Sequence, residues 1–347
     1  MSLPVWKWLH GQPTTRARFK VEAEDFEVIE DPVCEPDGAG EHILVKVRKR
    51  GENTAWVAGL LAKAAGVNRG AVTWAGLKDR HAVTEQWFGI HLPGKDEPDL
   101  SVIESDAIQI LHRERHSRKL RTGALRGNFF RILLRDISWS DELEARLEAI
   151  GQLGVPNYFG SQRFGRQGSN LETASAMFGG QRIRDRDKRS LALSAARSFL
   201  FNEVISARIE AGLMQTVLAG DCLMLAGSHS FFVEDEASAA LQARLDSGDV
   251  QLTAPLWGRG TSAARGEALA FETAALAAHS GWLEGLEQAG LNQERRALCL
   301  QPKGWSWSRE AEGLRLAFWL PAGCFATSVL RELVELEMEN GHEDSAQ

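Results

Sequence analysis

The sequence is poor in cysteine and tyrosine, with 4 cysteines and 1 tyrosine among 347 residues. The cysteines are widely separated and form no Cys-x-x-Cys pair; they are Cys34, Cys222, Cys299 and Cys324. Closely spaced cysteines are typical of structural zinc sites and of disulfide-rich secreted domains, so neither class is indicated. We expect reduced and mostly buried thiols.

Long hydrophobic runs are also missing. Every apolar stretch is interrupted by polar or charged residues well before the roughly 18 residues that a membrane span needs. The first residues, MSLPVWKWLHGQ, lack the apolar segment of a secretory signal. No Walker loop, GxGxxG fingerprint or His/Cys ligand cluster is present. We therefore expect a cytoplasmic protein that is not bound to a membrane and uses no cofactor and no metal.

Positive charge is scarce overall but locally concentrated. The net charge is -7, although 44% hydrophobic and 25% charged residues are ordinary for a globular protein. Three segments are basic, namely Lys46 to Arg50, His112 to Arg135 and Arg182 to Arg189, whereas Glu332 to Asp344 is acidic. Any one basic run is typical of a solvated face, but three of them also suit the phosphates of a structured RNA.

Hydrophobic periodicity predicts alternating strands and helices of an α+β protein. We expect strands over residues 19–30, 42–49, 71–75, 83–92, 127–137 and 314–320. Helices are expected to begin at Asn53 or Thr54 and end at Gly66, to follow Ser140, to span 190–212, and to begin at Thr327. The composition changes near residue 154, where a segment rich in glycine, polar and aromatic residues begins. This change predicts a second domain over 154 to about 300.

Asp79 is the first candidate for chemistry. It follows a short apolar strand that ends at Gly76, and its neighbours are Lys78, Arg80 and His81. Adjacent positive charge favours the ionised carboxylate, so we predict that Asp79 is a catalytic nucleophile. The competing interpretation is a turn or helix cap, which is the commonest use of an aspartate after glycine. We interpret His81 as a structural hydrogen bonder.

A second candidate comes from the strand at 127–137. Its period of two places Asn128 and Phe130 on one face, and Phe129 and Arg131 on the other. An amide and an aromatic ring on one face are suited to holding a nucleotide base.

Five sequence blocks together resemble one protein family. They are AGLKDRHAVTEQWF at 75–88, GNFFRILLR at 127–135, NYFGSQRFG at 157–165, LSAARSFLFN at 193–202 and WLPAGCFATSVLRELV at 319–334. In this order they closely resemble the TruD family of pseudouridine synthases, which isomerise uridine 13 of tRNA. The resemblance covers nearly the whole chain. It implies a catalytic domain of residues 1–153 and 301–347, with a mixed, largely antiparallel sheet and flanking helices, interrupted by an inserted α/β TRUD domain of residues 154–300.

The resemblance also implies roles for individual residues. The nucleophile falls on Asp79, and substrate-contacting positions fall on Phe26, Asn128 and Phe325. The aromatic residue that packs on the target base falls on Phe130. Lys20 matches a basic residue near the carboxylate, and Arg80 is a further possible partner.

Pseudouridine formation breaks and remakes a bond at C1′ without redox chemistry or hydrolysis, so an anionic group is needed there rather than a cofactor. The aspartate either bonds to C1′ or removes the 2′ proton. The target base must also leave its stack, which aromatic faces can compensate. The implied partner is tRNA, with no obligate protein partner evident.

Two rival functions remain open on the sequence. A catalytically inert protein on the same scaffold would bind or fold tRNA without forming pseudouridine. A cofactor-free nucleoside hydrolase would use Asp79 on a small substrate and would not need the basic segments.

Overall fold

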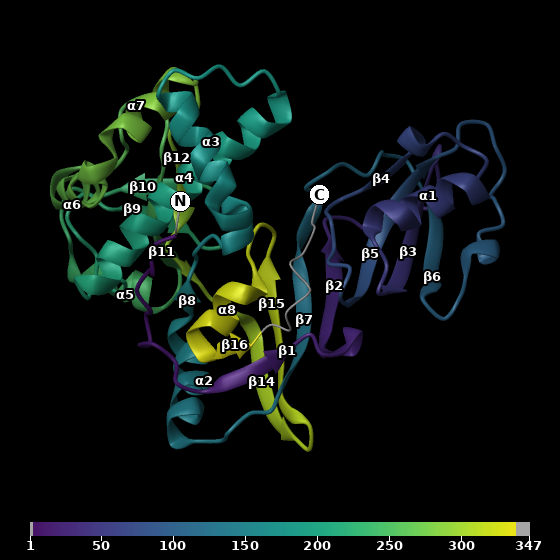
Figure 1. Ribbon diagram of the computed structural model, residues 1–347, viewed down its shortest axis with the longest axis horizontal. Coiled ribbons are helices and arrows are strands. Elements are labelled where there is room, and N and C mark those ends of the chain that lie inside the picture. Colours follow the sequence, from purple (N-terminus) through teal and green to yellow (C-terminus); the bar gives the residue numbers. More distant parts are fainter. Residues whose placement is uncertain (1–2, 338–347) are drawn as a thin grey trace. The chain divides into compact units, whose positions relative to one another are not determined.

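The computed structural model describes residues 3–337 and divides into two compact units. The sheet unit contains Thr14–Gly151, Pro302–Ala326 and the described chain from Leu333. The helical unit contains the described residues up to Pro13, together with Gln152–Gln301 and Thr327–Glu332. Figure 1 labels the elements of both units.

The sheet unit is built on a 10-stranded sheet. Its strands are β1 (Arg16–Phe19), β2 (Phe26–Pro32), β3 (His42–Arg50), β4 (Val72–Trp74), β5 (Val83–His91), β6 (Ile108–His116), β7 (Leu125–Arg135), β14 (Lys303–Glu310), β15 (Gly313–Pro321) and β16 (Glu335–Glu337). The main order is β14-β15-β7-β2-β5-β3-β6, with β4 beside β5 and with β1 between β7 and β16 (Figure 1). Only β2 with β5 and β1 with β16 pair in parallel among the described strands. The expected α+β class with a mixed, largely antiparallel sheet is confirmed.

Helix α1 (Thr54–Ala64) begins and ends where its sequence predicts. The Asn53 side chain accepts a hydrogen bond from the Ala55 N–H at 2.8 Å. Gly66 has the left-handed φ of 61° that ends a helix without a side-chain clash. Val57 and Leu61 pack with Val45 and other side chains of β3 and β5 in one hydrophobic core.

The strand register then defines two faces of the sheet. We call the side covered by α1 the α1 face; it carries Val47 and Lys49 of β3 and Gln86 of β5. The pairing of β5 with β2 and of β2 with β7 places Glu30 and Asn128 on this same face. The opposite face carries a separate apolar cluster of Leu44, Ala75, Trp87 and Leu120.

Strand β7 has the predicted alternation. Phe130, Ile132 and Leu134 are buried on the α1 face, whereas Phe129 is 49% exposed on the other. The following helix α2 (Asp141–Leu153) has the expected cap, because Ser140 Oγ accepts from the Leu143 N–H at 3.2 Å.

The helical unit surrounds one long helix, α4 (Arg186–Glu210). Its other helices are α3 (Ser169–Phe178), α5 (Ala239–Asp246), α6 (Gly266–Leu276), α7 (Ser280–Gln288) and most of α8 (Ala326–Leu333). A four-stranded sheet has the order β10 (Phe231–Val233), β9 (Cys222–Leu225), β11 (Val250–Leu256) and β12 (Glu294–Ala297), and β8 (Val155–Pro156) pairs with β13 (Cys299–Leu300).

The expected start of this long helix at residue 190 was wrong. The Asp185 carboxylate caps the helix earlier by accepting from the Asp187 and Lys188 N–H groups at 2.9 and 3.0 Å. Part of the basic segment Arg182–Arg189 is therefore the first turn of α4, and its charged side chains are exposed. The acidic segment Glu332–Asp344 lies mainly outside the described residues. No helix within residues 3–337 is long and apolar enough to cross a membrane.

Candidate active site

Asp79 lies in the loop that joins β4 to β5, and the buried side chains of Thr54 and Gln86 hydrogen-bond to the backbone of this loop. The Thr54 hydroxyl accepts from the Lys78 N–H at 3.1 Å and lies 2.9 Å from Gln86 Oε1. Gln86 Nε2 in turn donates to the Gly76 carbonyl at 3.3 Å. Because Thr54 and Gln86 are almost fully buried, the loop is attached to the first turn of α1 and to β5.

Lys78 and Glu30 form a buried ion pair beside this loop. Lys78 Nζ lies 2.7 Å from Glu30 Oε2, and the two side chains are 5% and 1% exposed. The second oxygen of Glu30 accepts from the Trp87 N–H at 3.2 Å. The ion pair and the hydrogen bond offset the free energy lost when the Glu30 carboxylate is buried. Lys78 is therefore attached to the sheet and does not face solvent.

Lys49 supports Asp79 directly and was missed in the sequence. Its side chain is fully buried, and Nζ donates to the carbonyls of Asp79 at 3.1 Å and Glu52 at 2.7 Å. Burial lowers the pKa of Lys49 from 10.5 to about 8, although the Asp79 charge opposes this effect.

The basic segment Lys46 to Arg50 was expected to suit RNA phosphates, and for the buried Lys49 this expectation was wrong. The signal was present, because Lys49 is in phase with the buried Val45 and Val47. Lys46 and Arg48 do lie on the outer face, where both pair with Glu85.

Among residues 3–337, Lys20 and the backbone of His81 contact the Asp79 carboxylate. Oδ2 forms an ion pair with Lys20 Nζ, and Oδ1 accepts from the His81 N–H at 2.9 Å. The side chains of Asp79 and Lys20 are 17% and 16% exposed. The two contacts fix the orientation of the carboxylate, and its remaining exposure leaves it accessible to a substrate. Arg80 instead donates to the Gly51 carbonyl at 3.3 Å, so Lys20 is the basic residue that contacts this carboxylate.

Lys20 has an unusual backbone and an aromatic surrounding. It directly follows β1 and has a φ of 61°, a left-handed conformation that is uncommon for a residue with a side chain. Its Nζ lies 4.8 Å from the ring centroid of Phe26 and 5.3 Å from that of Phe19. Ring faces attract a cation, so the ammonium group is held between Asp79 and two phenylalanines.

Phe26 and Phe130, two of the positions to which the resemblance gives a role, come together in an aromatic stack. Their ring centroids are 6.1 Å apart with an interplanar angle of 15°. Phe130 also stacks on Phe318 of β15 at 5.5 Å. Phe26 and Phe130 are only 8% and 6% exposed, so in this state they form the wall of a site and present little open ring surface.

An ion pair positions Phe26. Asp25 precedes it and binds Arg135 at the end of β7, with oxygen to nitrogen distances of 2.8 to 3.0 Å. Burial raises the pKa of Asp25, but the Arg135 hydrogen bonds and charge, together with hydrogen bonds from the Glu22 and Val21 N–H groups, hold the pKa below its usual value. The start of β2 is thereby tied to β7, which aligns the two stacked rings.

Asn128 offers an unused hydrogen-bond acceptor. It shares the α1 face with Phe130 and lies opposite Glu30 of β2 and Leu320 of β15. Its Oδ1 is buried and has no hydrogen-bond partner among residues 3–337. A buried, unsatisfied acceptor costs about 1–3 kcal/mol, so an atom of this kind points to a ligand that completes it.

Phe325 is half-buried in the turn between the end of β15 and the start of α8. Within the described part of the chain no other ring stacks on it. Its expected contact with the substrate stays a prediction.

Comparisons with known proteins agree on one family. A family model described as tRNA pseudouridine synthase D (TruD) matches residues 5–181 and 181–333. A tRNA pseudouridine synthase D of Aeromonas salmonicida is 64% identical over 330 residues, which cover 95% of this chain and 94% of the relative. That of Pseudoalteromonas atlantica is 47% identical over 342 residues, with coverage of 97% and 98%.

A solved structure has the same fold. It is a crystal structure from Methanosarcina mazei, provisionally assigned as tRNA pseudouridine synthase D (TruD), with a TM-score of 0.76, 23% identity and coverage of 96% of each chain. The resemblance drawn from the five sequence blocks is thus confirmed by an independent family model and by close relatives. This chain belongs to the tRNA pseudouridine synthase D (TruD) family.

Proposed function

We propose that this protein converts uridine 13 of tRNA into pseudouridine, and that the Asp79 carboxylate acts at C1′ of the flipped-out uridine. Family membership supports uridine isomerisation in tRNA. The observation that carries the role of Asp79 is its geometry: a partly exposed carboxylate, paired with Lys20, in a loop anchored by buried Lys49.

The reaction balances within the substrate. The bond from N1 to C1′ breaks, the uracil turns, and a bond forms from C5 to C1′. The C5 proton is lost and N1 gains a proton, so no group is added or removed. Asp79 either bonds to C1′ after the base departs or takes the 2′ proton, and both routes use the carboxylate that Lys20 and the His81 N–H hold in place.

Other residues of the sheet unit hold the uridine. Asn128 Oδ1 accepts a hydrogen bond from an N–H of the base, which satisfies its buried acceptor. Phe26 and Phe130 form an apolar wall against the base. Phe325 completes the contact from the turn after β15. Each of these roles is part of the proposal.

The proposed site residues all lie in the sheet unit. We therefore propose that this unit acts as the catalytic domain and that the segment from about 154 to 300 is an inserted domain. Because tRNA is the substrate, we expect the protein to act in the cytoplasm.

The test compares wild-type protein with Asp79→Asn on a tRNA transcript. Wild-type protein should form pseudouridine at position 13, mapped by mass spectrometry, whereas Asp79→Asn should bind tRNA but release no tritium from 5-labelled uridine. Asp96→Asn is the control, because Asp96 is an exposed carboxylate of the same unit. Pseudouridine at another position would contradict the site assignment, and an active Asp79→Asn variant would contradict the mechanism. Binding without any modification by wild-type protein would favour the inert tRNA-binding alternative.

A further inference from the structure

The opposite face of the sheet holds a cavity that the proposed reaction does not use. Its volume is about 600 Å³, within the range of sites that bind small organic ligands. Its floor is apolar and is formed by Leu44 and Trp87, and its wall adds the apolar side chains of Leu120 and Ala124. Leu44 and Trp87 alternate with Lys49 and Gln86 along their strands, so the cavity and the Asp79 anchor lie on different faces of the sheet.

The segment 117–124 forms a wall of the cavity and packs closely against β5. The segment 117–124 crosses β5 at Gly89, where an added Cβ would approach the Leu120 Cβ to 2.9 Å. The Gly123 N–H also donates to the Ala75 carbonyl at 2.7 Å. A glycine at the crossing point and a backbone hydrogen bond therefore hold the segment that shapes the cavity.

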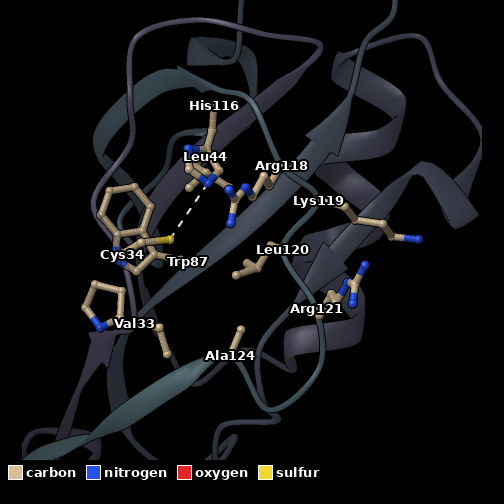
Figure 2. A pocket seen from close by; sticks show the side chains of 11 residues that line it. Val33, Cys34, Leu44, Trp87, His116, Arg118, Lys119, Leu120, Arg121 and Ala124 are labelled. Atoms are coloured by element: carbon tan, nitrogen blue, oxygen red, sulfur yellow. Dashed lines mark hydrogen bonds between the residues drawn. The ribbon is translucent and has the colours of Figure 1, made fainter.

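Positive charge surrounds the apolar floor. Arg118, Lys119 and Arg121 line the cavity, are exposed, and form no ion pair within residues 3–337. Figure 2 shows Lys119 and Arg121 together on one side of the cavity, across from Trp87. Elsewhere on this unit, several basic side chains are neutralised by glutamate partners, as Arg48 is by Glu85.

We propose that this cavity binds a second, unstacked nucleotide of the tRNA, with its base on the apolar floor and its phosphates on the three cations. Proteins recognise unpaired RNA by this combination of an apolar or aromatic surface for the base and cations for the backbone. An apolar peptide would use the floor but would leave the three cations without a partner. The inference rests on the proposed function, because it takes tRNA as the ligand.

Cys34 provides a native reporter for this site. It lines the cavity, is exposed, and its Sγ lies 3.7 Å from Nε2 of His116 (Figure 2). The other cysteines, Cys222, Cys299 and Cys324, are buried or half-buried and serve as internal references. Only Cys222 of the four cysteines is buried, so the expectation of mostly buried thiols was wrong.

The first experiment measures alkylation of Cys34 by iodoacetamide with and without tRNA, using peptide mass spectrometry. At about ten times the Kd of tRNA, labelling of Cys34 should slow about tenfold, because only unbound protein is labelled. Unchanged labelling, with Asp79-dependent pseudouridine formation retained, overturns the inference and leaves the proposed function intact. Absence of both tRNA binding and pseudouridine would instead reject the proposed function.

The second experiment separates base insertion from simple coverage by RNA. Ala124→Trp fills the cavity from its wall, and Val33→Trp does so from an exposed lining position, so at least one variant should fold normally. Either should raise KM for tRNA about tenfold, a loss of the size found when one base-stacking surface is removed, with kcat unchanged. Wild-type KM in both variants, at unchanged Tm, would exclude an inserted base.

The third experiment tests the phosphate contacts. Each contact to a single strand contributes about 0.7 to the slope of log Kd against log salt, so replacing Arg118, Lys119 and Arg121 by alanine should lower that slope by about 2. The matched control is Lys63→Ala, an exposed lysine on α1, which should leave the slope unchanged. Equal slopes in the triple variant and in wild-type protein would contradict the phosphate assignment.

Discussion

Replacing Lys49 by methionine tests whether a buried anchor sets the position of Asp79. Methionine has a similar unbranched stem but no N–H donor, so the carbonyls of Asp79 and Glu52 lose a shared partner. The loop that carries the carboxylate should then shift, while the surface that binds RNA is unchanged. We expect kcat to fall about 100-fold, because a displacement of about 1 Å at a reacting group can have an effect of this size.

The magnitude agrees with the energy of the contacts that are removed. A fall of about 100-fold in rate is about 2.7 kcal/mol in activation free energy. A hydrogen bond from a charged donor is worth about 1.5–3 kcal/mol, and Lys49 makes two of them. Loss of one to two such bonds can therefore account for the expected change.

The same residue makes a prediction about pH and stability. The pKa of Lys49 is about 8 when folded against an ordinary value of 10.5, so the unfolded chain binds more protons between these values. The free energy of unfolding should thus rise by up to about 3 kcal/mol as the pH rises from about 8 to 10.5. Below about pH 8, Lys49 should contribute no pH dependence to this free energy. Lys49→Met should lack this rise.

The assay is single-turnover tritium release, with urea unfolding at several pH values in parallel. The matched control is Lys46→Met on the outer face of the same strand, where Lys46 is 27% exposed and pairs with Glu85. A wild-type kcat in Lys49→Met would refute the anchor. A raised KM with unchanged kcat would mean that Lys49 contacts RNA, and an identical pH dependence in both proteins would refute the titration.

Three further substitutions, and Arg80→Met as a control, probe other contacts. Lys20→Met should lower kcat about 10- to 100-fold in single-turnover assays, because it removes a charged partner of Asp79. The kcat of Arg80→Met should stay near the wild-type value. Equal losses of kcat in the two variants would contradict the assigned pairing. Asn128→Leu should raise the free energy of unfolding in urea by about 1 kcal/mol, because it removes an unsatisfied buried acceptor, and should raise KM for tRNA; a loss of stability would show that the amide oxygen has a partner. Asp221→Asn should lower the free energy of unfolding by about 3–5 kcal/mol by leaving the fully buried Arg208 charge unpaired; a change below about 1 kcal/mol would count against this reasoning.

Local features of the fold were predictable because local physics determines them. The alternation of Phe129 and Phe130 on β7 follows from the period of a strand, and the cap at Asn53 follows from the unpaired N–H groups of a helix start. Strand order was not predictable in this way. The parallel pairing of Arg16 with Glu335 joins residues from both ends of the chain, and no local pattern marks it.

The candidate site likewise contains residues that local patterns predict and residues that only the three-dimensional structure identifies. Asp79, Asn128 and Phe130 were selected from their residue types, their spacing and the family resemblance. Lys49 was missed because charge was given more weight than phase: a lysine among basic residues suggests a surface, although its position in the alternation places it in the core. The choice of Lys20 over Arg80 as the partner of Asp79 depends on the turn after β1, which only the three-dimensional structure describes.

The late pairing of β15 with β7 has a consequence for biosynthesis. β15 spans residues Gly313–Pro321 and hydrogen-bonds along β7 from Gly127 to Arg135, so the sheet beside Asn128 and Phe130 lacks one neighbouring strand until β15 has been translated. Residues 152–301, which form most of the helical unit, leave the ribosome before β15 and can begin to fold first. A nascent chain therefore carries Asp79 long before it has a finished site around it, because the sheet beside Asn128 and Phe130 is complete only after β15 has been translated.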